Sequence, residues 1–327
     1  MGKVTALIVY VDDMVVTGND PMEITALQRK LASEFELKDL GNLKYFLGIE
    51  VARSALGIFL CQRKYVIDLL TETGMLDCKP AETPIEVNHG LSIQENQVLT
   101  DKDKYQRLIG RLIYLSHTRP DIAYVVSVLS QFMHSPGKTH MDAIFRVLRY
   151  LKSSPGKGLF FGRNNDYKIT GYTDADWVGD QNDRKSTSEY FMFVGKNLVT
   201  WRSKKQKVVA RSSVEAEFKS MAHSVCESIW IKRIIQNLGL RHPEPIMLHC
   251  DNKATIAIAN NPVQHDRTKH VEVDRHFIKD HLNQGIISLL FVSSQMQLAD
   301  VLTKAVSGKI FHSSLGKLGM MDIHSPT

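Results

Sequence analysis

Acidic residues stand at the ends of apolar segments in the second half of this 327-residue chain. Asp174 and Asp176 close the stretch KITGYTDADW, and Asp251 directly follows IMLHC. Glu217 lies in the first turns of a predicted long helix, and Asp300 is flanked by apolar residues in QLADVLTKAV. Strand ends and the starts of adjacent helices converge at the carboxyl edge of a sheet, so we expect these acids to meet there.

Such a cluster favours metal-dependent chemistry on phosphodiesters. A single acid at a strand end or helix start is usually a cap, a turn residue or part of a solvated rim. Several carboxylates in one place repel one another unless cations lie between them. Hard oxygen ligands suit Mg²⁺ or Mn²⁺, and two such ions about 4 Å apart can activate an attacking oxygen and stabilise a leaving one. Spacing does not separate Asp174 from Asp176, because residues two apart share one face of a strand.

Two more acids, Asp12 and Asp13, lie between apolar runs near the start of the chain. The runs, residues 6–11 and 14–16, are short and rich in β-branched residues, which predicts two strands joined by a turn. Aspartate is also a common turn residue, so the pattern by itself leaves the role of this pair open.

The surrounding sequence predicts the elements that must position these acids. After the hairpin we expect a helix capped by Asp20, a strand–turn–strand unit within residues 39–62 and a helix at about 64–73. A Pro-, Asn- and Gln-rich linker and three helical segments follow, up to about residue 153. Beyond residue 168 we expect three strands, a long helix capped by Ser212 with Glu215 at its third position, and then alternating strands and helices. This order predicts an α/β fold with an α+β front part.

Composition limits the possible classes of protein. The formal net charge is +6 and the isoelectric point is near 9.0, which is compatible with a polyanionic partner. No apolar stretch is long enough to cross a bilayer, and the first residues lack the pattern of a signal peptide, so we expect an intracellular protein that is not secreted and has no membrane partner. The four cysteines form no CxxC pair, and the histidine spacings match no familiar zinc site; the residues concerned are Cys61, Cys78, Cys226, Cys250, His265, His270, His276 and His281.

The stretch RSKKQKVVAR carries five cations. Lysines on an edge strand often serve only to prevent pairing with other chains. Beside a sheet whose acids favour chemistry on phosphodiesters, we favour contact with the phosphates of a nucleic acid, which would make binding salt-dependent. The residues are Arg202, Lys204, Lys205, Lys207 and Arg211. The neighbouring Trp201 is expected to pack in the core.

Nearly the whole chain resembles the C-terminal half of the Pol polyprotein of copia-type LTR retrotransposons. Among the matching stretches are YVDDM, YFLGIEV, YQRLIGRLIYLSHTRPDI, GYTDADW, SKKQKVVARSSVEAEF, CDNKATIAIANNPVQHDRTKHVEVDRHF and QLADVLTK. The resemblance implies a truncated reverse-transcriptase palm over residues 1–79, with the YVDD hairpin and a primer-grip-like hairpin. It further implies a helical thumb- or connection-like region over 80–156 and a ribonuclease H-like mixed sheet flanked by helices over 157–327.

The resemblance also assigns roles to the acids. Asp12 and Asp13 stand where reverse transcriptases place two metal-binding carboxylates of the polymerase site. The four acids of the ribonuclease H site, which hold two Mg²⁺ or Mn²⁺ ions, match Asp174, Glu217, Asp251 and Asp300, and the family pattern leaves Asp176 out. The implied activity is cleavage of the RNA strand of an RNA–DNA hybrid.

The implied partners are that hybrid, a template–primer and upstream Pol segments comprising the palm, the fingers and the integrase. The implied location is a cytoplasmic retrotransposon particle with possible access to the nucleus. Related nucleases use a mobile histidine to help product leave, a role for which His276 is a weak candidate.

Two departures from the family pattern bear on activity. The third palm aspartate and the fingers would lie upstream of residue 1, so we predict that this chain alone does not polymerise DNA. Glu189 stands where the family usually has glycine, and a charge there could weaken the sheet or mark a decaying copy. The alternative hypotheses are a relic that binds nucleic acid without cleaving it, and a relic that does not fold.

Overall fold

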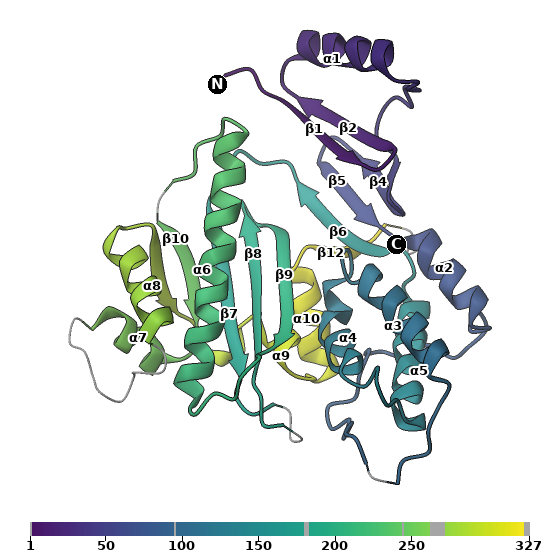
Figure 1. Cartoon of the computed structure of the whole chain (residues 1–327), viewed down its shortest axis with the longest axis vertical. Helices are drawn as coiled ribbons and strands as arrows, with labels where there is room; N and C mark the ends of the chain where they lie inside the picture. The colour runs from purple at the N-terminus through teal and green to yellow at the C-terminus, as the bar shows by residue number, and fades with distance from the viewer. Residues whose placement is uncertain (1, 95, 180–182, 244, 262–271, 324–327) are drawn as a thin grey trace.

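A computed structural model describes residues 2–94, 96–179, 183–243, 245–261 and 272–323. Its strands form three sheets, one of two strands and two of five strands. Figure 1 shows the N-terminal hairpin at one end of the molecule, a larger sheet with a long helix across its face, and a group of helices beside it. No helix in the described part of the chain is both long and apolar enough to span a membrane.

The N-terminal hairpin has the predicted form. Strands β1 (Thr5–Tyr10) and β2 (Asp13–Gly18) pair antiparallel, with Tyr10 opposite Asp13. Asp20 caps helix α1 (Pro21–Glu34), as predicted, because its side chain accepts a hydrogen bond from the backbone N–H of Glu23. The hairpin forms a sheet by itself, which leaves several of its apolar side chains exposed, including Ile8, Val9, Tyr10 and Val11.

The second sheet joins three distant parts of the chain. Its order is β12-β6-β5-β4-β3, and every pair in it is antiparallel. The strands are β3 (Tyr45–Phe46), β4 (Ile49–Arg53), β5 (Gly57–Cys61), β6 (Lys157–Gly162) and β12 (Met320–Asp322). Leu47 and Gly48 both have positive φ in the turn between β3 and β4, as a two-residue type I′ hairpin requires.

Four helices lie between strands β5 and β6 in the chain. They are α2 (Arg63–Glu72), α3 (Lys102–Leu115), α4 (Ala123–Ser130) and α5 (Lys138–Ser153), with a 3₁₀ turn at Pro120–Ile122. Their buried faces form one hydrophobic core with side chains from the third sheet and from the C-terminal helices, among them Phe191, Phe193, Leu302 and Phe311. The helical region and the C-terminal part of the chain therefore share a core.

A fully buried ion pair lies within this helical region. Arg119 donates three hydrogen bonds to Asp121, from Nε to Oδ1 at 2.9 Å and to Oδ2 at 3.2 Å, and from Nη2 to Oδ2 at 2.8 Å. The hydroxyl of Tyr150 donates to Asp121 Oδ2 at 2.5 Å, and Nη1 of Arg119 donates to the carbonyl of Ser154 at 3.2 Å. The side chains of Arg119 and Asp121 are 1% and 0% exposed, so water solvates neither charge. Each charge is stabilised by the other and by these hydrogen bonds.

The third sheet is mixed, as expected, and has the order β11-β10-β7-β8-β9. Its strands are β7 (Ile169–Asp176), β8 (Thr187–Val194), β9 (Asn197–Lys205), β10 (Ile246–Cys250) and β11 (Ile287–Phe291). Strands β7, β10 and β11 are parallel, whereas β8 and β9 continue the sheet in antiparallel pairs. The carboxyl ends of β7 and β10 consequently lie at the same edge.

Helices flank this sheet, and the long helix α6 (Ser213–Asn237) crosses it (Figure 1). Ser212 accepts the backbone N–H of Glu215 at 3.2 Å, which confirms the predicted cap, and Gly239 has the positive φ typical of a helix end. Buried apolar residues of α6 pack on β7, β8 and β10. The remaining helices are α7 (Lys253–Asn260), α8 (Glu272–Asn283), the short α9 (Asp300–Thr303) and α10 (Gly308–Lys317).

Candidate active site

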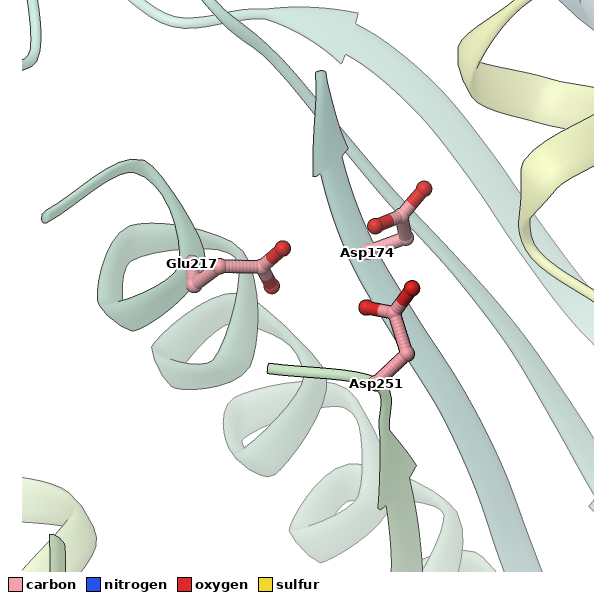
Figure 2. Close-up of side chains that lie close together, drawn as sticks. All are labelled: Asp174, Glu217 and Asp251. Atoms are coloured by element: carbon pink, nitrogen blue, oxygen red, sulfur yellow. The ribbon is translucent and has the colours of Figure 1, made fainter. Parts of the chain in front are cut away.

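Three of the acids singled out in the sequence meet at one edge of the mixed sheet. Asp174 lies near the end of β7, Asp251 directly follows β10, and Glu217 projects from the second turn of α6. Each contributes a carboxylate oxygen, and these oxygens lie within 4.8 Å of one another. Figure 2 shows the three side chains directed into the space between the helix and the strand ends. The arrangement is suited to hold a divalent cation.

Asp300 approaches the same cluster from α9. It contributes to raising the pKa of Asp174, yet it is not part of the close group of three. Its Oδ2 pairs with Nζ of Lys304 at 2.9 Å, and its buried Oδ1 makes no hydrogen bond. A buried carboxylate oxygen without a partner is costly, and a cation beside it would remove that cost.

Burial and mutual repulsion dominate the electrostatics of the cluster. Burial, followed by the charges of Asp300 and Asp251, raises the pKa of Asp174 to about 7. Burial and the neighbouring Asp174 and Asp251 also raise the pKa of Glu217 well above its usual value. Both shifts mean that gathering negative charge here is unfavourable without a counter-ion. The all-carboxylate donor set and the unpartnered oxygen of Asp300 fit Mg²⁺ or Mn²⁺.

Asp176 shares a face of β7 with Asp174 but stays outside the group of three. Burial raises its pKa, as does Asp300, while Lys304 lowers it. The structure therefore distinguishes two acids that spacing in the sequence did not separate.

Glu189 is a further acid beside the cluster, and it is fully buried. It lies on β8 directly opposite Asp174, so both side chains emerge on the same face of the sheet. Its Oε1 accepts a weak hydrogen bond of 3.4 Å from the hydroxyl of Ser203, and its Oε2 has no hydrogen-bond partner. Burial, followed by the charges of Asp174 and Asp176, raises its pKa well above the usual value.

This buried carboxyl group predicts a pH-dependent loss of stability in EDTA. The unfolded chain loses the Glu189 proton near pH 4.3, whereas the folded chain retains it to higher pH, so the free energy of unfolding falls as pH rises between those values. One such group contributes at most about 1.4 kcal/mol per pH unit. We expect Glu189→Gln to remove this contribution in urea unfolding measured from pH 5 to pH 8. The exposed Glu34→Gln is the control, and equal slopes for wild type and Glu189→Gln would contradict the assignment.

The N-terminal pair of acids is not arranged in the same way. Asp12 lies in the hairpin turn and Asp13 begins β2, and both side chains are exposed. Val11 in the same turn has a φ of 49°, unusual for a β-branched residue. Within the described ranges, no third acid, histidine or cysteine joins Asp12 and Asp13 in a metal-binding group.

The cysteine and histidines considered for zinc are spread over different environments. Cys250 is buried, with Sγ 3.9 Å from Oε2 of Glu217, and burial raises the pKa of its thiol. His276 lies 3.8 Å from Glu272 on α8, and His281 bonds to the carbonyl of Phe277. His265 and His270 lie outside the described residues.

The basic side chains of strand β9 project from both faces of the sheet. Arg202 and Lys204 are exposed, whereas Nζ of Lys205 is held by Asp183 at 2.9 Å and by the side chain of Gln131 at 3.0 Å. Trp201 packs against the shared core and donates its indole N–H to the carbonyl of Ser116. Arg202 and Lys204 thus remain available to a polyanion.

Comparison with known proteins places this geometry in a family. Residues 2–87 match a family described as reverse transcriptase (RNA-dependent DNA polymerase). The retrovirus-related Pol polyprotein from transposon RE1 of Arabidopsis thaliana is 42% identical over 318 residues, which cover 97% of this chain and 22% of that protein. This chain belongs to the Pol polyproteins of copia-type retrotransposons.

Other similar proteins agree with this assignment. The Pol polyprotein from transposon TNT 1-94 of Nicotiana tabacum is 36% identical over 323 residues, covering 96% of the chain and 24% of that relative. The copia-type chain thus spans between a fifth and a quarter of the length of these relatives. The structure of a foamy viral protease-reverse transcriptase in complex with an RNA/DNA hybrid superimposes on 88% of the chain and 36% of that protein, with a TM-score of 0.52 and 12% identity. This likeness shows that the copia-type chain shares the fold of that viral reverse transcriptase.

Proposed function

We propose that this segment of a copia-type Pol protein hydrolyses the RNA strand of RNA–DNA hybrids in a reaction that requires Mg²⁺ or Mn²⁺. The observation that carries the proposal is the group of Asp174, Glu217 and Asp251, whose oxygens lie within 4.8 Å of one another although they come from three separate elements. Asp300, with an unpartnered buried oxygen, completes a set of four acids that would hold two ions.

Two bound ions would supply an activated water and stabilise the departing 3′ oxygen. In the net reaction a water oxygen bonds to phosphorus, the bond from phosphorus to the 3′ oxygen breaks, and the products are a 5′-phosphate and a 3′-hydroxyl. Asp174, Glu217 and Asp251 would hold the cations in fixed positions. The positive charge placed there would orient the phosphate that is cut. Lys304, 2.9 Å from Asp300, offsets part of the negative charge that would otherwise repel the substrate.

The proposed partners are an RNA–DNA hybrid or template–primer and the remaining parts of Pol. Exposed Arg202 and Lys204 on β9 provide cations for the phosphate backbone. The 2′-hydroxyls and groove shape of a hybrid would select it over DNA duplex. The exposed apolar hairpin β1–β2 is a surface that other Pol segments would cover.

We further propose that the chain does not synthesise DNA by itself. Asp12 and Asp13 are exposed, and no third ligand joins them within the described ranges. A polymerase site of the two-metal kind needs several carboxylates around its ions. Templated primer extension by the isolated chain would overturn this proposal.

The test of the nuclease proposal is a comparison of labelled substrates. We expect wild-type chain with Mg²⁺ to cut the RNA strand of a hybrid and to leave DNA duplex, RNA duplex and single-stranded RNA intact. EDTA should abolish the cleavage, and added Mn²⁺ should restore it. Absence of hybrid cleavage with either metal would refute the proposal.

A second candidate function is binding without cleavage, and Glu189 is the observation that favours it. A buried acid opposite Asp174 places a further carboxyl group, which burial and its acidic neighbours keep from ionising readily, beside a site that already gathers carboxylates. Salt-dependent binding of the hybrid, with no cleavage in Mg²⁺ or Mn²⁺, would support this alternative. Recovery of cleavage in Glu189→Gly would then identify the extra carboxyl group as the cause.

A further inference from the structure

An exposed apolar patch lies beside the acids and is not used in the proposed chemistry. It consists of Trp177, Val208 and Val209, which are 48%, 58% and 47% exposed. Trp177 follows Asp174 by three residues and comes directly after the end of β7. Its indole N–H donates to the carbonyl of Ala210 at 3.1 Å, which ties the end of this strand to the loop that carries the two valines.

The loop that carries the valines is anchored at both ends. Gln206 is buried, and its side-chain amide donates to Ser188 at 2.8 Å and to the carbonyl of Ala216 at 3.0 Å. At the other end, the backbone N–H of Arg211 donates to Glu215 at 2.8 Å. Because Trp177 also holds Ala210, next to Arg211, the patch is a fixed surface, and a ligand would bind it at little cost in conformational entropy.

The backbone next to Trp177 is held in an unfavourable conformation. Val178 has a φ of 58°, in the left-handed region that β-branched residues rarely adopt. Its N–H donates to the hydroxyl of Ser186 at 3.2 Å, which supports the turn. Strain that the surrounding structure maintains beside a cluster of acids is an observation that points to function.

Two cations flank the apolar patch. Lys207 and Arg211 are exposed at the two ends of the loop, and neither side chain forms an ion pair within the described ranges. A rigid aromatic and aliphatic surface between free cations is complementary to a nucleic acid strand, which offers sugar and base faces between phosphates. A protein partner would be expected to bring acids for Lys207 and Arg211, but the neighbouring Asp174 cluster favours a phosphodiester.

We propose that Trp177, Val208 and Val209 form the surface on which the sugar edge of the bound RNA–DNA hybrid rests, with Lys207 and Arg211 contacting the flanking phosphates. This inference rests on the proposed function. Trp177 lies three residues beyond Asp174, which is about 10 Å along an extended backbone. Successive nucleotides are about 3.4 Å apart, so the patch would lie roughly three nucleotides from the phosphate that is cut. The patch is therefore a substrate-binding surface and Trp177 a positioning residue.

The test measures binding of a labelled hybrid to the full chain in EDTA, so that cleavage does not interfere. Trp177→Ala is expected to weaken binding by roughly five- to a hundredfold, the range for losing an aromatic contact with a nucleotide. Trp230→Ala is the matched control, because Trp230 is 56% exposed and lies on α6 about 20 Å along the helix from Glu217. Its binding should stay within twofold of wild type.

Tryptophan emission gives a second measurement, since the chain contains only Trp177, Trp201 and Trp230. The hybrid should quench the emission of wild type and Trp230→Phe, and most of that quenching should be lost in Trp177→Phe. Equal binding by Trp177→Ala and Trp230→Ala, with wild type binding well, would overturn the inference and leave the nuclease proposal intact. Wild type that neither binds nor cuts the hybrid would refute the nuclease proposal itself.

Discussion

Replacing Asp174 with asparagine is expected to lower the rate of Mg²⁺-dependent hybrid cleavage by at least about a hundredfold. Losing a residue that only supports a metal ligand already costs about 10- to 100-fold, and Asp174 is proposed to bind the metal itself. Asp174 is the central acid of the site, since it neighbours Glu217, Asp251 and Asp300. Asparagine preserves the shape of the side chain but removes the charge that would hold a cation. Gel-based cleavage assays at several Mg²⁺ concentrations measure the effect.

Asp176→Asn is the matched control for that substitution. Asp176 lies two residues further along the same strand face but outside the group of three, so we expect cleavage within about threefold of wild type. In EDTA, Asp174→Asn should also be more stable than wild type at pH 8, because it removes a buried carboxylate whose pKa is raised to about 7. Loss of activity together with increased stability would separate a catalytic role from a folding defect, whereas equal activity of the two variants would contradict the role of Asp174.

The sequence predicted those parts of the fold that local patterns specify. The hairpin around Asp12, the cap of α6 at Ser212 and the strand endings at Asp174 and Asp251 depend on residues close in the chain, and the structure has all of them. The meeting of three acids followed from a general property of sheets, because parallel strands end at the same edge. The resemblance to copia-type Pol proteins, which the comparisons confirm, supplied the choice of Asp174 over Asp176.

Pairing between distant segments could not be predicted in this way. Strands β6 and β12 were not expected, because each is short and obtains its hydrogen bonds from partners far away in the chain: β6 pairs with β5, and β12 pairs with β6. The division at residue 157 remains a proposal, although β6 joins a strand of the front part. The burial of Glu189 could not be predicted either, since it follows from register with Asp174 and from the packing of α9.

Only part of the patch around Trp177 could be recognised from the sequence. An exposed tryptophan cannot be recognised from its letter alone, because most tryptophans are largely buried. The basic stretch that includes Lys207 and Arg211 was recognised, but as part of a strand. The structure places Lys207 and Arg211 on a loop that Trp177 fixes through Ala210, and this contact joins residues 33 positions apart.

The largest effect on stability is expected for Asp121→Asn. The substitution keeps the shape of the side chain but leaves the guanidinium of Arg119 buried without a counter-charge. Removing one member of a buried ion pair costs about 3–5 kcal/mol in the free energy of unfolding. Tyr150 would also lose a charged acceptor for its hydroxyl. Urea unfolding at pH 7 measures the change, and the exposed pair of Lys64 and Asp68 supplies the control, since Asp68→Asn should cost less than about 1 kcal/mol.

The difference in free energy of unfolding between wild type and Asp121→Asn should change with pH in a definite direction. Burial opposes ionisation of Asp121, but the charge and hydrogen bonds of Arg119 prevail and hold the pKa of Asp121 below its usual value. A carboxyl group with a lowered pKa in the folded state stabilises the protein above the unfolded pKa of about 3.9, and this contribution disappears as pH falls through the folded pKa. The gap between wild type and Asp121→Asn should therefore be constant from pH 5 to pH 8 and shrink below pH 4. A gap under 1 kcal/mol at pH 7 would mean that the buried pair stabilises the helical region no more than an exposed one does.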